Sequence, residues 1–390
     1  MTWFNAKILK SIGINHDLAY VTIGNIGSAV LGAVFWLILA SMLIAESYGL
    51  LNYYLASTFI FGTVALLGLN PTVTTYLAKG VEKVKYPSNF MALLSSVAFI
   101  APLILLTGYL QLSMLLIGVA IFQMSVAELL GRKKYKEYTL ILVGQRAAQI
   151  VLGISLYFVY GMDGVIVGYT LAFLAFSYRY LVTIKNFTFD FAQIRSNFKF
   201  MMHSYAMEVA RTVSMFSDKL LIAPLFGFAV LGLYQLGAQF LLFLSMVPTI
   251  FYHYLLSQEA GGAHRRGIAM GGFIISSILA ALFVILAPLI ITTLFPNFTG
   301  SILAAQLMSI GIIPMTVTSA LSSRFLGMER SRPVFIGAVI YVATQYATIV
   351  ILGSSFGIVG LAISLTIALT AQSLYLLIAS RVHRVLIESL

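Results

Sequence analysis

The chain has 390 residues, of which 60% are hydrophobic and 9% charged, and its mean hydropathy is +0.99. A soluble domain carries about 25% charged residues, so this chain has too few polar side chains to cover a surface in water. In spite of a net charge of +11, the composition excludes a soluble enzyme, a disordered regulator and a nucleic-acid-binding module, and it predicts an all-α polytopic membrane protein.

Apolar stretches of about 20 residues, the length that crosses a bilayer as a helix, recur along the whole chain. The first follows Asp17 and is too long for the core of a signal peptide, so we expect it to be retained. The second contains Pro71, at which we expect a kink. Twelve transmembrane helices are predicted, at residues 18–41, 49–78, 90–110, 112–130, 138–160, 165–184, 202–225, 230–256, 268–295, 302–326, 334–352 and 358–379.

The distribution of the 23 lysines and arginines predicts the orientation. With Lys7 and Lys10 inside, all of them fall at cytoplasmic ends or loops except Arg146, Arg211 and Lys219, which lie within predicted helices. Positive residues are retained on the cytoplasmic side of a membrane. We therefore expect a multi-pass protein of the plasma membrane with cytoplasmic N- and C-termini.

The sequence also matches itself at a fixed offset, which predicts an internal repeat. The predicted helices form two lobes of six, residues 1–190 and 191–390, with the same orientation in the bilayer, as in parallel repeats whose axis runs along the membrane normal. A cavity between the lobes is the expected place for a substrate that crosses the membrane. An offset of 196 pairs Gln149 with Gln345, Gly161 with Gly357 and Gly164 with Gly360, and an offset of 183 pairs Gly49 with Gly232.

No catalytic motif is present in the sequence. It contains no glycine-rich phosphate loop, no His/Glu spacing typical of a metal site and no cysteine. We therefore expect a transporter and not an enzyme, with no cofactor and no metal.

Charged and amide side chains inside the predicted helices are the candidate site, because charge at bilayer depth is tolerated only when it faces protein or water. The fifth helix carries Arg146 with Gln149 on the same face, and the seventh carries Arg211 and Asp218 on one stripe with Glu208 beside it. Asn25 and Gln345 are further polar candidates for substrate binding.

Two interpretations of these charges stay open. The two arginines can bind an anionic group of a substrate, since guanidinium matches phosphate oxygens in a bidentate way. Alternatively, Arg211 pairs locally with Glu208 or Asp218 and only holds the helix in the bundle. Asp218 and Glu208 are correspondingly expected to couple an ion or to pair structurally.

Two short segments of the sequence form recognisable motifs. The first is Glu-Ser-Tyr-Gly-Leu-Leu-Asn-Tyr-Tyr at 46–54 with Leu-Leu-Gly-Leu-Asn at 66–70, and the second runs from Asp-Lys-Leu-Leu-Ile at 218–222 to Gly-Leu-Tyr at 232–234. These segments resemble the polysaccharide transporter family, whose members flip lipid-linked oligosaccharides and share a superfamily with the multidrug and toxin extrusion carriers.

The resemblance implies a two-lobed fold that moves an isoprenoid-pyrophosphate-linked glycan to the outer leaflet by alternating access. It also implies a cationic cavity, which would suit Arg146 and Arg211 on facing lobes. The chain departs from the family in having the minimal twelve helices and in offering only Asn25 and Ser28 on the first helix, where relatives can carry charge.

The leading hypothesis is therefore a flippase for a lipid-linked glycan, with that glycan, membrane lipids and a coupling ion, H+ or Na+, as partners. The alternatives are a cation-coupled multidrug antiporter, which needs acidic groups in the membrane, and a membrane partner that transports nothing. The expected outer loops are very short for recruiting another protein.

Overall fold

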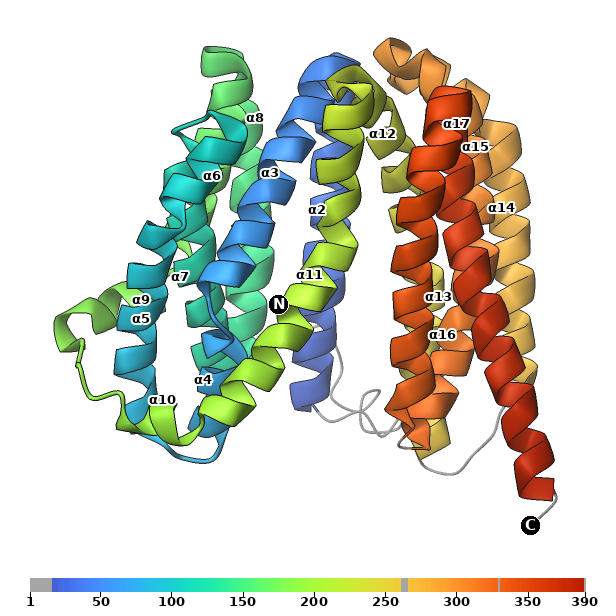
Figure 1. Ribbon diagram of the computed structural model, residues 1–390. Helices are drawn as coiled ribbons and strands as arrows, with labels where there is room; N and C mark the ends of the chain where they lie inside the picture. Colours follow the sequence, from blue (N-terminus) through green and yellow to red (C-terminus); the bar gives the residue numbers. More distant parts are fainter. Residues whose placement is uncertain (1–15, 261–265, 329, 389–390) are drawn as a thin grey trace. The chain divides into compact units, whose positions relative to one another are not determined.

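The computed structural model describes residues 16–260, 266–328 and 330–388, so Lys7 and Lys10 lie outside the described residues. The described chain is helical and contains no strand (Figure 1). Its helices are α2 (His16–Met42), α3 (Ala45–Ala65), α4 (Leu69–Ala78), η1 (Glu82–Val84), α5 (Lys85–Ala98), α6 (Ile100–Thr107), α7 (Leu112–Gly131), α8 (Tyr135–Ala175), α9 (Tyr178–Thr183), η2 (Ile184–Asn186), α10 (Ala192–Ser196), α11 (Phe198–Phe226), α12 (Phe228–Leu244), α13 (Met246–Ala260), α14 (Arg266–Leu294), η3 (Pro296–Ser301), α15 (Ile302–Ile310), α16 (Ile312–Gly327) and α17 (Ser331–Glu388).

Eight of the described helical segments are long and apolar enough to cross a membrane, or nine if the bent pair α3 and α4 is counted as one span. The predicted span at 202–225 forms a helix, α11, but is not among them because it carries several charged residues. The chain is thus a multi-pass membrane protein.

Two of the eight segments, α8 and α17, turn back on themselves at a glycine. Gly161 in α8 has φ 60° and ψ −139°, a conformation that only glycine adopts readily. A methyl group added to Gly168 would lie 2.6 Å from the backbone N of Gly153, whereas 15 residues of straight helix span about 22 Å. Gly357 makes the same turn in α17, with φ 56° and ψ −134°.

The bend in the second predicted span is not at Pro71, as expected, but just before it. Leu67 and Gly68 have positive φ angles of 53° and 75°, and α3 and α4 meet at 52°. Pro71 lies in the first turn of α4, where a missing backbone N–H breaks no helical hydrogen bond. The expectation was wrong because a proline near a helix start is compatible with a straight helix.

The chain divides by its internal contacts into two compact units. The first comprises the described parts of Met1–Phe35 with Tyr53–Leu220, and the second comprises Trp36–Asn52 with Leu221–Leu390. This division differs from a boundary at residue 190, because most of α11 belongs to the first unit and the start of α3 to the second. Lobes of six helices each stay a prediction.

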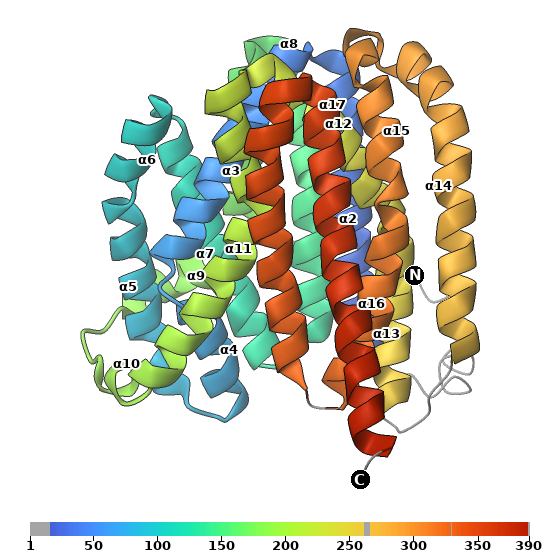
Figure 2. The same cartoon turned by 45° about the vertical axis from the view of Figure 1, so that its right-hand side comes forward.

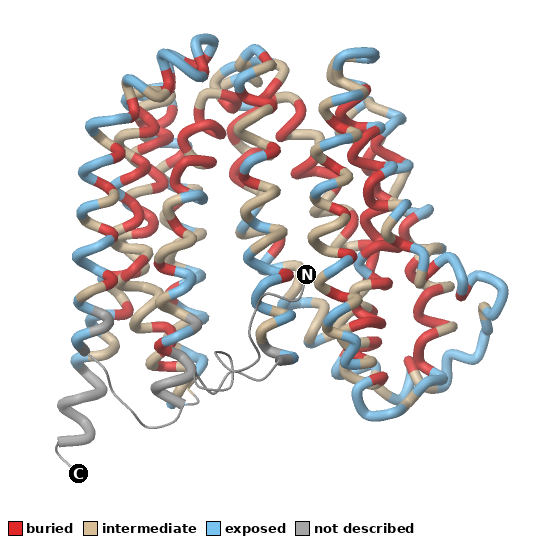
Figure 3. The backbone as a smooth tube through the Cα atoms, turned by 180° about the vertical axis from the view of Figure 1, so that it is seen from behind, coloured by how far each residue is buried: buried red, intermediate tan, exposed pale blue. Residues whose placement is uncertain are grey.

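In the first unit, α7 is the central helix. Its mostly buried residues pack against α4, α5 and α8 (Figure 3). A buried cluster that includes Leu69, Val73, Ala92, Ile121 and Met124 joins α4, α5 and α7.

In the second unit, α15 packs against α12, α14 and α17, and α16 packs against α13, α14 and α17 (Figure 2). The start of α3 also belongs here, since Tyr48 is fully buried and packs edge-on against Phe298, with ring centroids 5.5 Å apart.

Candidate functional site

Arg146 of α8 lies in a buried polar cluster inside the first unit. Its Nη1 donates to Oε1 of Gln149 at 2.7 Å and to the hydroxyl of Tyr169 at 3.2 Å. Gln149 is one helical turn further along α8, and Tyr169 is on the segment of α8 that returns after Gly161. The reversal at Gly161 thus brings the tyrosine to the arginine.

The hydrogen-bond partners of Arg146, Gln149 and Tyr169, are neutral, and no carboxylate among the described residues forms an ion pair with it. Gln149 is fully buried, and its Oε1 also accepts from Nε2 of Gln145 at 3.4 Å. Its own Nε2 is buried without a hydrogen-bond partner. The cluster therefore combines an uncompensated positive charge with an unused donor, a combination suited to an anion.

The depth of the cluster follows from helix geometry. Arg146 is eight residues past residue 138, the predicted start of this span, about 12 Å along the helix axis. This is well inside a hydrocarbon core about 30 Å thick. A charge at that depth is costly unless it faces water or a counter-charge.

Helix α2 packs alongside this part of α8 through small residues. The two helices run in the same direction, because Asn25, Gly32 and Phe35 meet Tyr138, Arg146 and Gly153 in that order. A methyl group on Gly32 would lie 3.8 Å from Nε of Arg146, an ordinary van der Waals distance, so this turn of α2 lies beside the guanidinium group.

Asn25 does not join the Arg146 cluster. Its Oδ1 accepts from the hydroxyl of Tyr138 at 2.8 Å. Tyr138 is two turns before Arg146 in α8, about 12 Å away along the axis. Asn25 is exposed.

The charges on α11 form two local ion pairs. Nη2 of Arg211 lies 2.8 Å from Oε2 of Glu208, and the arginine side chain is 71% exposed. Nζ of Lys219 lies 3.1 Å from Oδ1 of Asp218, and these side chains are only 10% and 11% exposed. Both expected acidic residues are therefore paired with a cation.

Arg211 is in the same compact unit as Arg146, which differs from the expectation of facing lobes. Gln345 is 2% exposed in α17, in the second unit. Of the seven residues predicted for the site, the structure brings Arg146 and Gln149 together in one cluster.

Sequence reasoning missed two side chains that matter here, Tyr169 and Gln145, which complete the Arg146 cluster. It placed Lys219 within a predicted helix but did not pair it with Asp218, whose charge it neutralises. The spacing of Gln145 and Gln149, four residues apart on one helix, was a usable signal. Tyr169 gave none, because its approach depends on the turn at Gly161.

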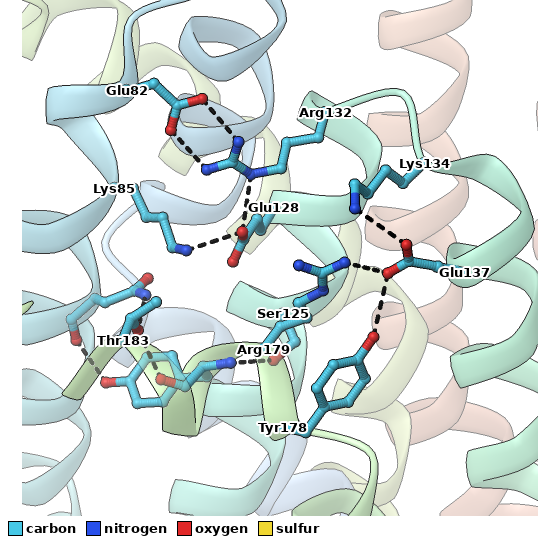
Figure 4. Close-up of polar contacts among 12 residues, drawn as sticks. Glu82, Lys85, Ser125, Glu128, Arg132, Lys134, Glu137, Tyr178, Arg179 and Thr183 are labelled. Atoms are coloured by element: carbon cyan, nitrogen blue, oxygen red, sulfur yellow. Dashed lines mark hydrogen bonds and ion pairs between the residues drawn. The ribbon is translucent and has the colours of Figure 1, made fainter. Parts of the chain in front are cut away.

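A second polar cluster joins the ends of several helices in the first unit (Figure 4). Oε1 of the buried Glu128 lies 2.8 Å from Nζ of Lys85 and 2.8 Å from Nε of Arg132, and Arg132 also binds Glu82 through two nitrogens. Burial lowers the pKa of Arg132, but hydrogen bonds to Glu82 and Glu128 outweigh it, so the net pKa is raised. This cluster is charge-balanced and holds helix ends together.

Next to it, Glu137 of α8 accepts hydrogen bonds from Arg179, Lys134 and Tyr178 (Figure 4). The sequence assigned these basic residues a topological role only. The ion pair between Arg179 and Glu137 also links α8 to the short helix α9.

Comparisons of the whole chain with solved structures show the fold. It resembles the inward closed conformation of the lipid II flippase MurJ with a TM-score of 0.69 and 14% identity, over 93% of this chain and 87% of that one. It resembles an inward-facing MATE family multidrug resistance transporter of the MOP superfamily with a TM-score of 0.67 and 16% identity, over 95% and 96% of the chains. For the eukaryotic MATE transporter AtDTX14 the TM-score is 0.59 at 17% identity, over 93% and 94%.

These structures are of a flippase and of transporters, not of enzymes. A comparison with functionally curated proteins gives no significant match. Residues 14–253, more than half of the chain, match the family described as polysaccharide biosynthesis protein. The resemblance read from the two sequence segments is thereby confirmed, and the chain belongs to the polysaccharide biosynthesis protein family.

Proposed function

We propose that this protein is a flippase. It moves an oligosaccharide linked to an isoprenoid phosphate or pyrophosphate from the cytoplasmic to the outer leaflet by alternating access, for the synthesis of a cell-surface polysaccharide or glycan. Membership of the polysaccharide biosynthesis protein family supports the pathway, and the likeness to the MurJ flippase supports a fold able to do this.

The observation that carries the proposal is the Arg146 cluster. A pyrophosphate brings two or more negative charges into the membrane, which is unfavourable unless a fixed cation receives them. Arg146 has neutral partners, and the amide nitrogen of Gln149 is an additional free donor. Together they can bind phosphate oxygens while the lipid tail remains in the bilayer.

We also propose the full architecture of twelve spans in two parallel six-helix lobes. The turns in α8 and α17 support it, because they have the same geometry at an offset of 196. A methyl group on Gly164 would lie 2.0 Å from the carbonyl O of Leu156, and one on Gly360 would lie 1.9 Å from that of Leu352. If α8 and α17 each supply two spans and α11 one, the nine apolar spans become twelve.

The proposed location is the plasma membrane, with both termini in the cytoplasm and with H+ or Na+ as coupling ion. Arg211, Asn25 and Gln345 remain proposed contacts of the glycan or its phosphates. Glu208 and Asp218 remain proposed for ion coupling or structural pairing.

The test is translocation of a fluorescent lipid-linked oligosaccharide in vesicles that contain the purified protein. Replacement of Arg146 by Ala removes the charge and is expected to reduce the rate at least tenfold, since a charge-assisted hydrogen bond contributes about 1.5–3 kcal/mol. Arg195→Ala removes an exposed arginine outside the cluster and serves as the control. Equal rates for Arg146→Ala and the unchanged protein would refute the proposed site.

The alternative function is a cation-coupled multidrug antiporter. The structural similarity to MATE transporters is compatible with this function. Such a carrier needs acidic groups that can release and take up a cation. In this chain Asp218 and Glu208 are each within 3.1 Å of a basic nitrogen, which favours the flippase. Efflux of a cationic dye by cells that express the protein would favour the antiporter.

A further inference from the structure

A groove lies within the first compact unit where α4 ends and α11 begins. None of the residues that line it belongs to the Arg146 cluster. The groove is open, has a volume of about 910 Å³ and is lined by Tyr76 of α4, by residues 196–200 and by one face of α11. Figures 1 and 2 both show the end of α4 beside α10 and the start of α11. The two helices approach closely at Gly68, because a methyl group there would lie 2.5 Å from the carbonyl O of Met201.

The floor of the groove is apolar. The ring of Tyr76 packs edge-on against Phe200, with centroids 5.7 Å apart. Met202 and Ala206, one turn apart on α11, continue this surface along the helix. A hydrocarbon chain lying along α11 would find a matching surface here.

The rim of the groove is basic. Lys199 and His203 lie on the same face of α11 as the apolar floor, at i and i+4. Nζ of Lys79 lies 5.1 Å from the ring centroid of Tyr76, which brings a second ammonium group to this end of α4. No acidic side chain is among the described residues that line the groove.

The residues around the groove are those expected at the level of lipid headgroups. The apolar part of α4 ends at Ala78, directly before Lys79, and Lys199 stands three residues before the predicted start of the α11 span. The segment between α9 and α11 is largely exposed (Figure 3). It carries Phe189, which is 75% exposed, and Phe198 at the start of α11 is 54% exposed. Aromatic and basic residues together are typical of the membrane–water interface.

We propose that this groove binds an anionic phospholipid of the cytoplasmic leaflet. The headgroup phosphate contacts Lys199, Lys79 and His203, and an acyl chain lies along Met202 and Ala206. Basic pockets between membrane helices on the cytoplasmic side recognise such headgroups. The side of the membrane rests on the proposed topology, whereas the site is independent of the glycan substrate.

The experiment measures binding of fluorescent phosphatidylglycerol to the full-length protein in nanodiscs of phosphatidylcholine. Lys199→Gln is expected to weaken binding about fivefold, the effect of one lysine near the surface. Lys136→Gln, which removes an exposed lysine at the start of α8, is the matched control and is expected to change nothing. Lys199→Arg keeps the charge and is expected to bind normally.

A second pair of variants tests the apolar floor. Ala206→Trp fills the groove and is expected to abolish binding, whereas Ala210→Trp, at an exposed position one turn away and outside the lining, is expected to bind normally. Equal affinity for Lys199→Gln and Lys136→Gln would overturn the headgroup contact, and normal binding by Ala206→Trp would overturn the acyl-chain contact.

Two further outcomes decide the class of ligand. Competition by inorganic phosphate alone, at the concentration at which the lipid binds, would overturn a lipid site in favour of a site for free phosphate. Glycan translocation by the same variants is read separately, so loss of lipid binding with normal flipping supports this proposal and leaves the proposed function intact.

Discussion

Gly49 of α3 and Gly232 of α12 face each other across a contact that leaves no room for a side chain. A methyl group on Gly49 would lie 1.9 Å from the carbonyl O of Phe228, and one on Gly232 would lie 1.8 Å from the carbonyl O of Ala45. The contact is reciprocal, because each glycine meets the backbone four residues before the other. The same offset of 183 relates Gly49 to Gly232 and Ala45 to Phe228, as expected if the two segments are repeat equivalents.

Substitution of either glycine by alanine is expected to destabilise the protein. Because the added methyl group meets backbone and not a movable side chain, the cost is expected at the upper end of the 1–3 kcal/mol typical of overpacking. Thermal unfolding of the purified protein in detergent measures it. Gly271→Ala, which meets nothing within 4 Å in α14, is the control, and an unchanged midpoint for Gly49→Ala would contradict the close crossing.

The turns at Gly161 and Gly357 lead to a second prediction. Nothing lies within 4 Å of an added Cβ at either position, so alanine there costs backbone strain alone. Positive φ with ψ near −135° is disfavoured for alanine by about 1–3 kcal/mol. Gly161→Ala and Gly357→Ala are therefore expected to lower the unfolding midpoint by similar amounts. A large difference between them would show that the two turns are not equivalent.

Gln149→Glu separates a binding role of Arg146 from a packing role. The new carboxylate takes the place of an amide oxygen 2.7 Å from Nη1 of Arg146, so it keeps the contact and cancels the positive charge. Folding is expected to be retained and translocation of the lipid-linked glycan is expected to fall at least tenfold. Gln149→Met removes the contact without adding a charge and is the comparison.

If Arg146 only packs, Gln149→Glu would transport as well as the unchanged protein. The thermal midpoint of each variant, measured in the same preparation, shows whether loss of transport has a structural cause.

Asp218→Asn tests the buried pair on α11. It leaves the ammonium of Lys219, whose side chain is 10% exposed, without its carboxylate. Loss of one partner of a buried pair costs about 3–5 kcal/mol. The thermal midpoint is expected to drop and to recover in Asp218→Asn with Lys219→Met, which removes both charges.

The double variant also distinguishes the two functions. Ion coupling through Asp218 would abolish uphill transport in the double variant although stability is restored. A structural pair predicts that transport returns together with stability.

The membrane class, the all-helical fold and the positions of most helices were predictable because they depend on local properties. A run of about 20 apolar residues can satisfy its backbone in lipid only as a helix, wherever it lies in the protein. Arg146, Asp218 and Glu208 were predictable as candidate site residues, since a charged residue within such an apolar run is rare. Their residue types and spacing also indicated that pairing on α11 was an alternative to substrate binding.

The tyrosine at Arg146 and the crossing of α3 with α12 depend on contacts between residues far apart in the chain. Tyr169 reaches Arg146 because Gly161 reverses the helix, and Gly49 meets Gly232 across 183 residues. Helical periodicity predicts which residues share a face of one helix but not which face of another helix they meet. The three-dimensional packing therefore decided that Tyr169 completes the cluster around Arg146, whereas the pairs of Arg211 and Asp218 are local to α11.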